Sequence, residues 1–189
     1  TDKRATFLAL SHEYFQPELV NEDQIAGGAL QHYDALYVLD AWISEAAQKT
    51  IEAWVKEGGL LWACADAGLK NEYDEPHDLL DRLAGVKRTY SNTNLGANAL
   101  LVSPVQGQAK FAPHNVPGQG RPISIASAKA RILATYGDGV PAWMECNVRK
   151  GKVVYGGHRA GLNYASRGGR WKDKKIWPDA GEIDFINQQ

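Results

Sequence analysis

Residues 33–66 contain a strand, a helix and a second strand, an order that strongly limits how the chain can fold. A short apolar run ends at Asp40, and Ser44 follows as the expected N-cap of a helix. The apolar positions of this helix share one face: Ala47, Ile51, Trp54 and Val55. Gly58 is expected to end the helix, and residues 60–65 are almost wholly apolar, as in a strand covered on both faces. The pattern predicts a βαβ unit and therefore a sheet with parallel strands.

The C-terminal third of the chain has a different pattern. Three apolar runs, at residues 130–136, 141–148 and 153–157, are separated by short turns that contain glycine. Runs so closely spaced predict an antiparallel meander, because a parallel connection needs a dozen or more residues. The sequence therefore predicts an α/β fold that carries an antiparallel meander near its C-terminus.

The N-terminal segments give weaker signals. Residues 5–15 lack a clear period-two alternation, so we expect a helix there that ends before Pro17. Residues 18–21 are expected to form a short strand. Residues 23–28 are expected to form one turn of helix that is closed by glycines.

The middle of the chain is expected to contain one helix and one long connection. Pro76 suits a first helical turn, with Asp74 or Glu75 as the cap and Gly85 as the end of the helix. The prolines and glycines of residues 104–122 predict a long irregular connection.

Composition and charge exclude several classes of function. The chain has 189 residues, 44% of them hydrophobic and 23% charged, which suits a single globular domain. A net charge of -1 argues against a nucleic-acid partner, and no apolar run is long enough to cross a bilayer. The two cysteines make no disulfide framework, and the sequence has no phosphate-binding loop, dinucleotide fingerprint or metal-ligand spacing. We therefore expect no cofactor, no metal, no nucleic acid and no membrane span.

Several segments, taken in order, are similar to those of a known family. The segments are Gly28-Ala-Leu with Tyr33-Asp-Ala-Leu-Tyr-Val, Val55-Lys-Glu-Gly-Gly-Leu-Leu, Leu83-Ala-Gly-Val, Ile132-Leu-Ala-Thr-Tyr-Gly-Asp-Gly-Val-Pro-Ala and Arg149-Lys-Gly-Lys-Val-Val-Tyr-Gly-Gly. Over about residues 5–160 the chain resembles class I glutamine-amidotransferase-like domains. More narrowly, it resembles the trimerisation domain of bacterial β-galactosidases and related glycoside hydrolases.

The resemblance implies a fold, a domain organisation and partners. The implied fold is a flavodoxin-like three-layer sandwich with a mainly parallel sheet. Residues 1–165 would form the domain, with its first strand upstream of Thr1, and residues 166–189 a tryptophan-rich polar tail or linker. The implied partners are the protein's own hydrolase domain or sister subunits. Contacts with them are expected through the tail and through residues 104–122.

Candidate chemistry lies where three predicted strands end, since open α/β sheets bind ligands there. The residues are Asp40, then Cys64 with Asp66, then His158 with Arg159. The resemblance implies that an active member would carry a cysteine nucleophile on a glycine-flanked turn and a His-Pro-Glu motif that supplies the base. Here Cys64 has no glycine two residues before or after it, and the motif is replaced by His158-Arg-Ala. We therefore expect Cys64 and His158 to be structural, and Asp40 and Asp66 to be turn or helix-capping carboxylates.

Three functions follow from these observations. The first is a non-catalytic accessory domain of a carbohydrate-active, glycoside-hydrolase-like protein, which associates domains or subunits or shapes a glycan cleft. The second is a Cys–His hydrolase or amidotransferase that uses Cys64 and His158. The third is a sugar-binding module that uses exposed tryptophans. Ligand contacts are expected at Asp40, Asp66, Arg159 and Trp171.

Overall fold

The computed structural model describes residues 2–88, 93–95, 101–116 and 118–168. Its helices are α1 (Asp2–His12), α2 (Glu22–Ala26), the 3-10 helix η1 (Ala29–His32), α3 (Glu45–Glu57), α4 (Leu79–Ala84) and α5 (Ala160–Gly168). Its strands are β1 (Ala35–Val38), β2 (Leu60–Cys64), β3 (Val86–Arg88), β4 (Thr93–Asn94), β5 (Leu101–Pro104), β6 (His114–Asn115), β7 (Gln119–Gly120), β8 (Ile123–Ile125), β9 (Ala130–Tyr136), β10 (Pro141–Val148) and β11 (Gly151–Gly156). None of the helices in these ranges is long and apolar enough to span a bilayer.

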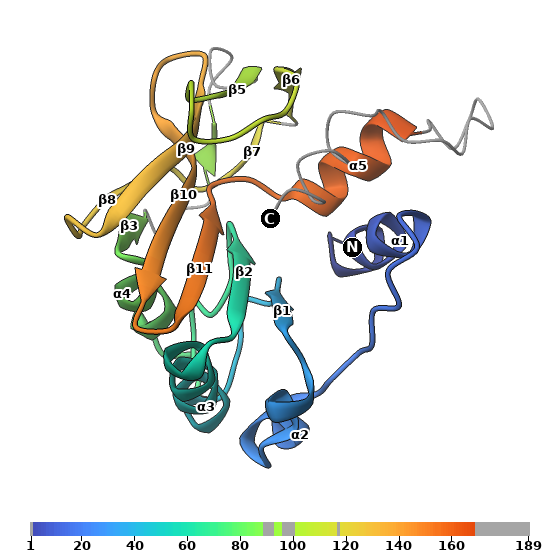
Figure 1. Ribbon diagram of the computed structural model, residues 1–189, viewed down its shortest axis with the longest axis vertical. Helices are drawn as coiled ribbons and strands as arrows, with labels where there is room; N and C mark the ends of the chain where they lie inside the picture. Colours follow the sequence, from blue (N-terminus) through green and yellow to red (C-terminus); the bar gives the residue numbers. More distant parts are fainter. Residues whose placement is uncertain (1, 89–92, 96–100, 117, 169–189) are drawn as a thin grey trace.

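A seven-stranded mixed sheet forms the centre of the molecule, in the order β1-β2-β11-β10-β9-β5-β6 (Figure 1). β2 pairs in parallel with β1 and with β11, whereas the four pairings from β11 to β6 are antiparallel. The expectation of a mainly parallel sheet is therefore wrong. Two of the four antiparallel pairings are the hairpins of the meander, since tight hairpins connect only antiparallel strands. The other two come from β5 and β6, strands in the middle of the chain that extend the sheet beyond β9. The α/β class and the meander are confirmed, and the flavodoxin-like three-layer sandwich stays a prediction.

The helix of the opening βαβ unit forms as its sequence predicts. Ser44 caps α3, since its side chain accepts a hydrogen bond from the backbone N–H of Ala47 at 3.4 Å. Gly58 ends the helix at a φ of 134°, a conformation that costs glycine little. The helix expected over residues 5–15 is also confirmed as α1.

Two local expectations are wrong. Residues 18–21 form no strand but an extended connection between α1 and α2, in which Glu18 accepts a hydrogen bond from the Tyr33 hydroxyl at 2.6 Å. The helix expected to start near Pro76 begins instead at Leu79, after Asp78. Pro76 is held in a β-bridge with Lys70, which keeps its segment extended.

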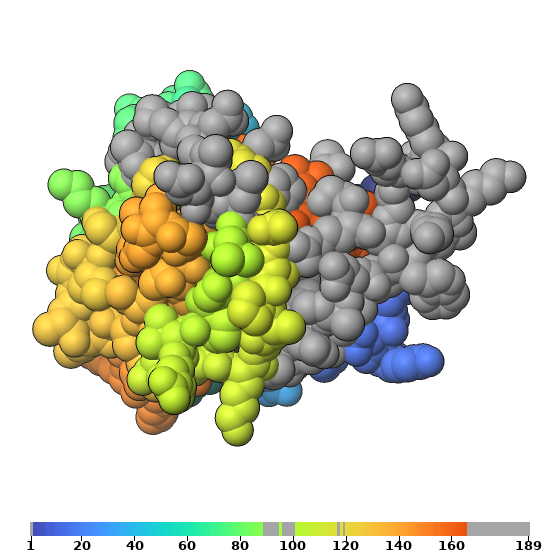
Figure 2. All heavy atoms as spheres, turned by 90° about the horizontal axis from the view of Figure 1, so that it is seen from above, coloured from blue at the N-terminus to red at the C-terminus, as the bar shows by residue number. Residues whose placement is uncertain are grey.

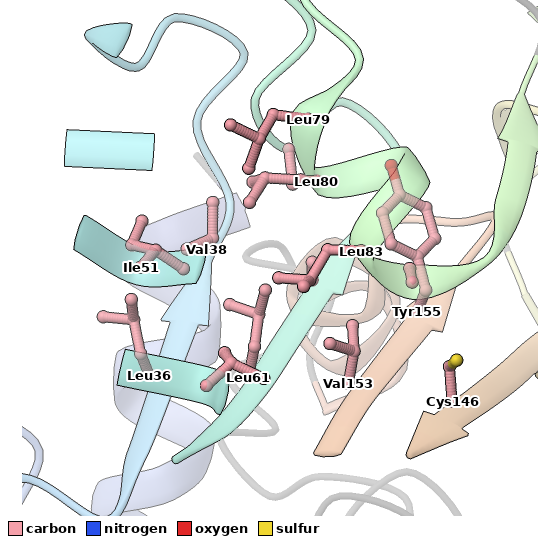
Figure 3. Close-up of a cluster of buried hydrophobic side chains, with 14 of the residues drawn as sticks. Leu36, Val38, Ile51, Leu61, Leu79, Leu80, Leu83, Cys146, Val153 and Tyr155 are labelled. Carbon is pink, nitrogen blue, oxygen red and sulfur yellow. The ribbon is translucent and has the colours of Figure 1, made fainter. Parts of the chain in front are cut away.

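α3 and α4 cover one face of the sheet and bury the larger apolar core (Figure 3). The core residues labelled there come from both helices and four strands: Leu36, Val38, Ile51, Leu61, Leu79, Leu80, Leu83, Cys146, Val153 and Tyr155. Ile51, Leu61 and Leu80 have no exposed surface. Burial of side chains of this size stabilises the fold by about 1.5–3 kcal/mol each.

Aromatic side chains fill the opposite face of the sheet. The ring of Trp62 lies 5.2 Å from that of Tyr37 and 4.9 Å from that of Trp143, measured between centroids. Trp143 in turn lies 5.0 Å from the His158 ring, edge to face. Gly156 makes room for this row, because a Cβ there would lie 2.2 Å from the Trp143 ring.

The segment expected to be a long connection packs on the sheet. Phe111 and Val116 are buried in the same core as Trp62 and Trp143. Figure 2 shows the green and yellow atoms of this segment beside the orange atoms of the meander. The buried apolar side chains of residues 104–122 are therefore not available as a contact surface.

α1 and α5 lie side by side next to the β1 edge of the sheet (Figure 1). The side chain of Asp2 accepts a hydrogen bond from the Leu162 N–H at 2.7 Å, so α1 satisfies a free donor in the first turn of α5. Gly161 permits this close approach, since a Cβ there would lie 2.3 Å from the Thr6 hydroxyl. The domain boundary at residue 165 stays a prediction, and residues 169–189 lie outside the described ranges.

Candidate functional site

The ends of β2 and β11 bring together four of the residues singled out in the sequence. Cys64 is the last residue of β2 and pairs in register with Gly156, the last residue of β11. Asp66 follows the first strand, and His158 with Arg159 follows the second. The parallel pairing of the two strands places these side chains at one edge of the sheet, as expected.

Cys64 is buried and poorly suited to act as a nucleophile. Its side chain is 1% exposed, and its thiol lies 3.5 Å from a carboxylate oxygen of Asp2. Burial and the negative charge of Asp2 raise the pKa of the Cys64 thiol well above its ordinary value. The thiol therefore stays protonated at neutral pH, whereas a nucleophilic cysteine acts as the thiolate.

The strained residue of the turn after β2 is Ala65 and not Cys64. Ala65 has a φ of 41°, in the left-handed region that residues other than glycine seldom occupy. Its N–H donates to the Gly156 carbonyl at 2.7 Å, and its own carbonyl accepts a hydrogen bond from Arg88 at 3.1 Å. These bonds hold the backbone in that conformation. The residue at this elbow thus carries only a methyl group and cannot attack a substrate.

His158 is completely buried among aromatic rings. Its Nδ1 lies 3.2 Å from the Tyr136 hydroxyl, and its ring packs against Trp143. Burial raises the pKa of the Tyr136 hydroxyl, so this group remains a neutral partner. The surroundings fit the expectation of a structural histidine.

Asp66 forms ion pairs with two arginines at the same edge. Its carboxylate accepts hydrogen bonds from Arg121 and from Arg159, whose Nε lies at 3.0 Å. Burial alone would raise the pKa of Asp66, but the hydrogen bonds from Arg159 and Arg121 lower it below its ordinary value. Asp66 is therefore an ionised bridge between β2 and the segments around the two arginines.

Sequence reasoning missed Arg121 and Asp2 as members of this cluster. Arg121 reaches it because Gly120 lies against the Gly157 carbonyl, where a Cβ would be only 2.1 Å away. The Arg121 N–H then donates to that carbonyl at 2.7 Å. The sequence contained one signal for this contact, Gly120 in the proline-rich connection, because a glycine permits a close backbone approach. A glycine does not show, however, which strand end the connection approaches.

Two other candidate residues lie apart from this cluster. Asp40 is exposed and pairs with Lys3 of α1 at 2.8 Å, while its backbone carbonyl accepts the Gly68 N–H at 2.8 Å. The Asp40 carboxylate therefore contacts α1, and its expected role as a turn or helix-capping carboxylate stays a prediction. Trp171 lies outside the described residues.

A hollow of about 590 Å³ lies near the opposite end of the meander strands. Buried Glu145 sits in its wall and pairs with Arg131 at 2.7 Å and Lys152 at 3.0 Å. Another guanidinium nitrogen of Arg131 donates a hydrogen bond to the side-chain carbonyl of Gln108 at 3.0 Å. One carboxylate thus faces two cations, and Lys110 also lines the hollow, so its charged groups leave an excess of positive charge. Within the described ranges, no three His, Cys, Asp or Glu side chains are grouped so that they could hold a metal ion.

Comparison with known proteins shows a shared fold. No family model and no curated protein matches the chain. The β-galactosidase of Rahnella sp. R3 matches 99% of this chain with a TM-score of 0.76 and 22% identity. The exo-β-1,4-mannosidase Op5Man5 of Opitutaceae bacterium strain TAV5 matches 97% with a TM-score of 0.68 and 16% identity. A cytoplasmic protein of Salmonella typhimurium LT2 matches 92% with a TM-score of 0.63 and 15% identity.

The matched share of each relative differs widely. The chain spans 26% of the β-galactosidase and 30% of the mannosidase, but 79% of the Salmonella protein. The fold is therefore that of one part of larger glycoside hydrolases, and it also makes up most of a shorter protein. At these identities the likeness concerns the fold alone.

Proposed function

We propose that this chain is a non-catalytic, amidotransferase-like accessory domain of a multidomain glycoside-hydrolase-like protein, in which it associates domains or subunits. The observation that carries the proposal is the shared fold over nearly the whole chain with about a quarter of a β-galactosidase. The strand ends support the non-catalytic part, because the strained elbow residue is Ala65 and the neighbouring thiol is buried and protonated.

An exposed apolar surface supports the association role. α1 and the segment after it present four large apolar side chains to solvent: Leu8, Tyr14, Phe15 and Leu19, with Tyr14 95% and Leu19 79% exposed. All four fall within residues 8–19, and exposed apolar patches mark interaction sites. We call this set the α1 surface and propose it as the contact with a sister subunit or hydrolase domain.

The proposal predicts concentration-dependent assembly of the chain. Sedimentation velocity over a wide concentration range is expected to show self-association that is lost in the variant Tyr14→Ser/Leu19→Ser, because burial of these side chains drives the contact. Ile125→Ser is the matched control, since Ile125 is 48% exposed on a different element. A chain that stays monomeric and does not bind the parent hydrolase domain would contradict the proposal.

The enzymatic alternative makes an opposite prediction for Cys64. We expect iodoacetamide at pH 8 to leave Cys64 unmodified in the folded protein and to modify it in urea, because only unfolding exposes the thiol and restores its ordinary pKa. Peptide mapping distinguishes Cys64 from Cys146, the second buried thiol. Rapid alkylation of Cys64 in the native state would favour the Cys–His enzyme instead.

A further inference from the structure

Trp42 is an exposed tryptophan that follows β1, at the edge of the sheet where β2 and β11 also end. Trp42 lies in the turn between β1 and α3, and 56% of it is exposed. Tyr73, in the loop after β2, is 75% exposed. A hydrogen bond from Trp42 to Asp74, the neighbour of Tyr73, brings the two loops together.

The Trp42 side chain is fixed although it is exposed. Its indole N–H donates to Oδ1 of Asp74 at 2.7 Å, and the same oxygen accepts a hydrogen bond from Lys70 at 2.6 Å. The Lys70 ammonium also lies 5.5 Å from the centroid of the indole ring, within range of a cation–π interaction. Backbone pairing of Trp42 with Lys70 in a β-bridge anchors the base of the side chain.

The loop that carries Asp74 is held by hydrogen bonds of its own. Asn71 braces it, because its side-chain carbonyl accepts hydrogen bonds from the N–H groups of Tyr73 and Glu75, both at 3.0 Å. Asp74 has a φ of 63°, a left-handed conformation that costs energy in a residue other than glycine, although aspartate tolerates it better than most. This strained turn places the carboxylate where it holds both Trp42 and Lys70.

The surroundings favour a small polar ligand over a protein partner. The cores of protein interfaces are depleted of charged residues. Here the loop around the two rings carries charged groups on either side, Lys70, Glu72, Asp74 and Glu75. The other exposed large apolar side chains among the described residues lie on different elements: Leu8, Tyr14, Phe15, Leu19, Leu101 and Ile125. A flat apolar ring with a polar rim is therefore the feature that a ligand would meet.

We propose that Trp42 forms a platform for one pyranose unit of a saccharide, in a region where Tyr73 is also exposed. A pyranose has an apolar face of C–H groups and a rim of hydroxyls, so it matches an aromatic ring bordered by hydrogen-bonding groups. Asp74 uses Oδ1 for both of its contacts and is 66% exposed, so the carboxylate can accept further hydrogen bonds from sugar hydroxyls. Because the ring is already fixed, binding would not have to order it.

Isothermal titration of the whole chain with β-1,4-galactotetraose and with β-1,4-mannotetraose tests the proposal. We expect saturable binding of at least one of them, and Trp42→Ala is expected to weaken it roughly tenfold. Trp42→Phe, which keeps an aromatic face, is expected to lose less. Ile125→Ala is the control, because Ile125 is 48% exposed on β8, outside the platform and the α1 surface, and it should bind like the wild type.

Three outcomes would overturn the platform. The first is that neither tetrasaccharide binds saturably, and the second is that Trp42→Ala leaves the binding unchanged. The third is that Trp42→Ala abolishes self-association, which would make the site a protein contact. Thermal unfolding of each variant shows whether the fold is retained. The result is separable from the association role, because that role is tested on the α1 surface with Tyr14→Ser/Leu19→Ser.

Discussion

Replacement of Arg88 by methionine is expected to lower the free energy of unfolding by about 3–5 kcal/mol at pH 7.5, because it leaves a buried carboxylate without its partner. The Arg88 side chain has no exposed surface, and its Nε donates to Asp81 at 2.9 Å. It also donates to the carbonyl of Ala65, so the substitution removes a bond that holds the strained elbow. Urea unfolding monitored by tryptophan fluorescence measures the change.

The cost of Arg88→Met is expected to depend on pH. Burial raises the pKa of Asp81 to about 6 even with Arg88 present, and loss of the guanidinium raises it further. The folded state then holds a proton on Asp81 that the unfolded state, with a pKa near 3.8, has released. The stability of the wild type therefore falls as the pH rises from about 4 to about 6, and that of the variant goes on falling up to its higher folded pKa. The cost of the substitution thus grows above about pH 6 and is largest at neutral to alkaline pH.

The double variant Asp81→Asn/Arg88→Met is the control for this pair. It removes both charges, so it should recover much of the lost stability and show little pH dependence between pH 5 and about 8. A loss below about 1 kcal/mol in Arg88→Met, equal at both ends of this range, would contradict the role of the pair as a buried ion pair.

Gly156→Ala is expected to destabilise the protein by about 1–3 kcal/mol or more, because overpacking forces side chains away from their preferred positions. A Cβ at this position would lie 2.2 Å from the ring of Trp143, which has no exposed surface and packs against Trp62 and His158. The ring cannot move without disturbing these neighbours. Thermal and urea unfolding measure the effect.

A double-mutant cycle separates this clash from other effects of the added methyl group. Trp143→Leu removes the ring that the methyl group meets, so Gly156→Ala should cost much less in that background. Equal costs in the two backgrounds would show that the clash with Trp143 is not the cause. Gly27→Ala is a mild comparison, since the nearest atom there would be 3.1 Å away.

Elements with a strong local pattern were predictable from the sequence. For α3, the sequence shows where the helix begins, at Ser44, which face is apolar, and where the helix ends, at Gly58. The helix forms as expected. The meander was predictable for the same reason, because its turns are too short for any other connection. What failed was the balance of parallel and antiparallel pairs, since strand order depends on contacts between distant segments.

The candidate site shows the same division. Cys64, Asp66, His158 and Arg159 could be placed at one edge because they follow strands that the sequence reveals. Arg121 and Asp2 could not, because they reach the edge from a proline-rich segment and from the far end of the chain. The fixed position of Trp42 likewise depends on Asp74 and Lys70, which come from the loop after the next strand.

The packing of α1 has a consequence for the order of folding. Ala9 and Leu10 are buried against Tyr164, and Asp2 bonds to Leu162, so the main partners of α1 lie about 150 residues further along the chain. Contacts across such a separation pay a large loop-closure entropy and form late. α1 is the first of the described elements to be synthesised, and α5 is the last. The apolar side chains of α1 therefore stay uncovered until α5 has been made.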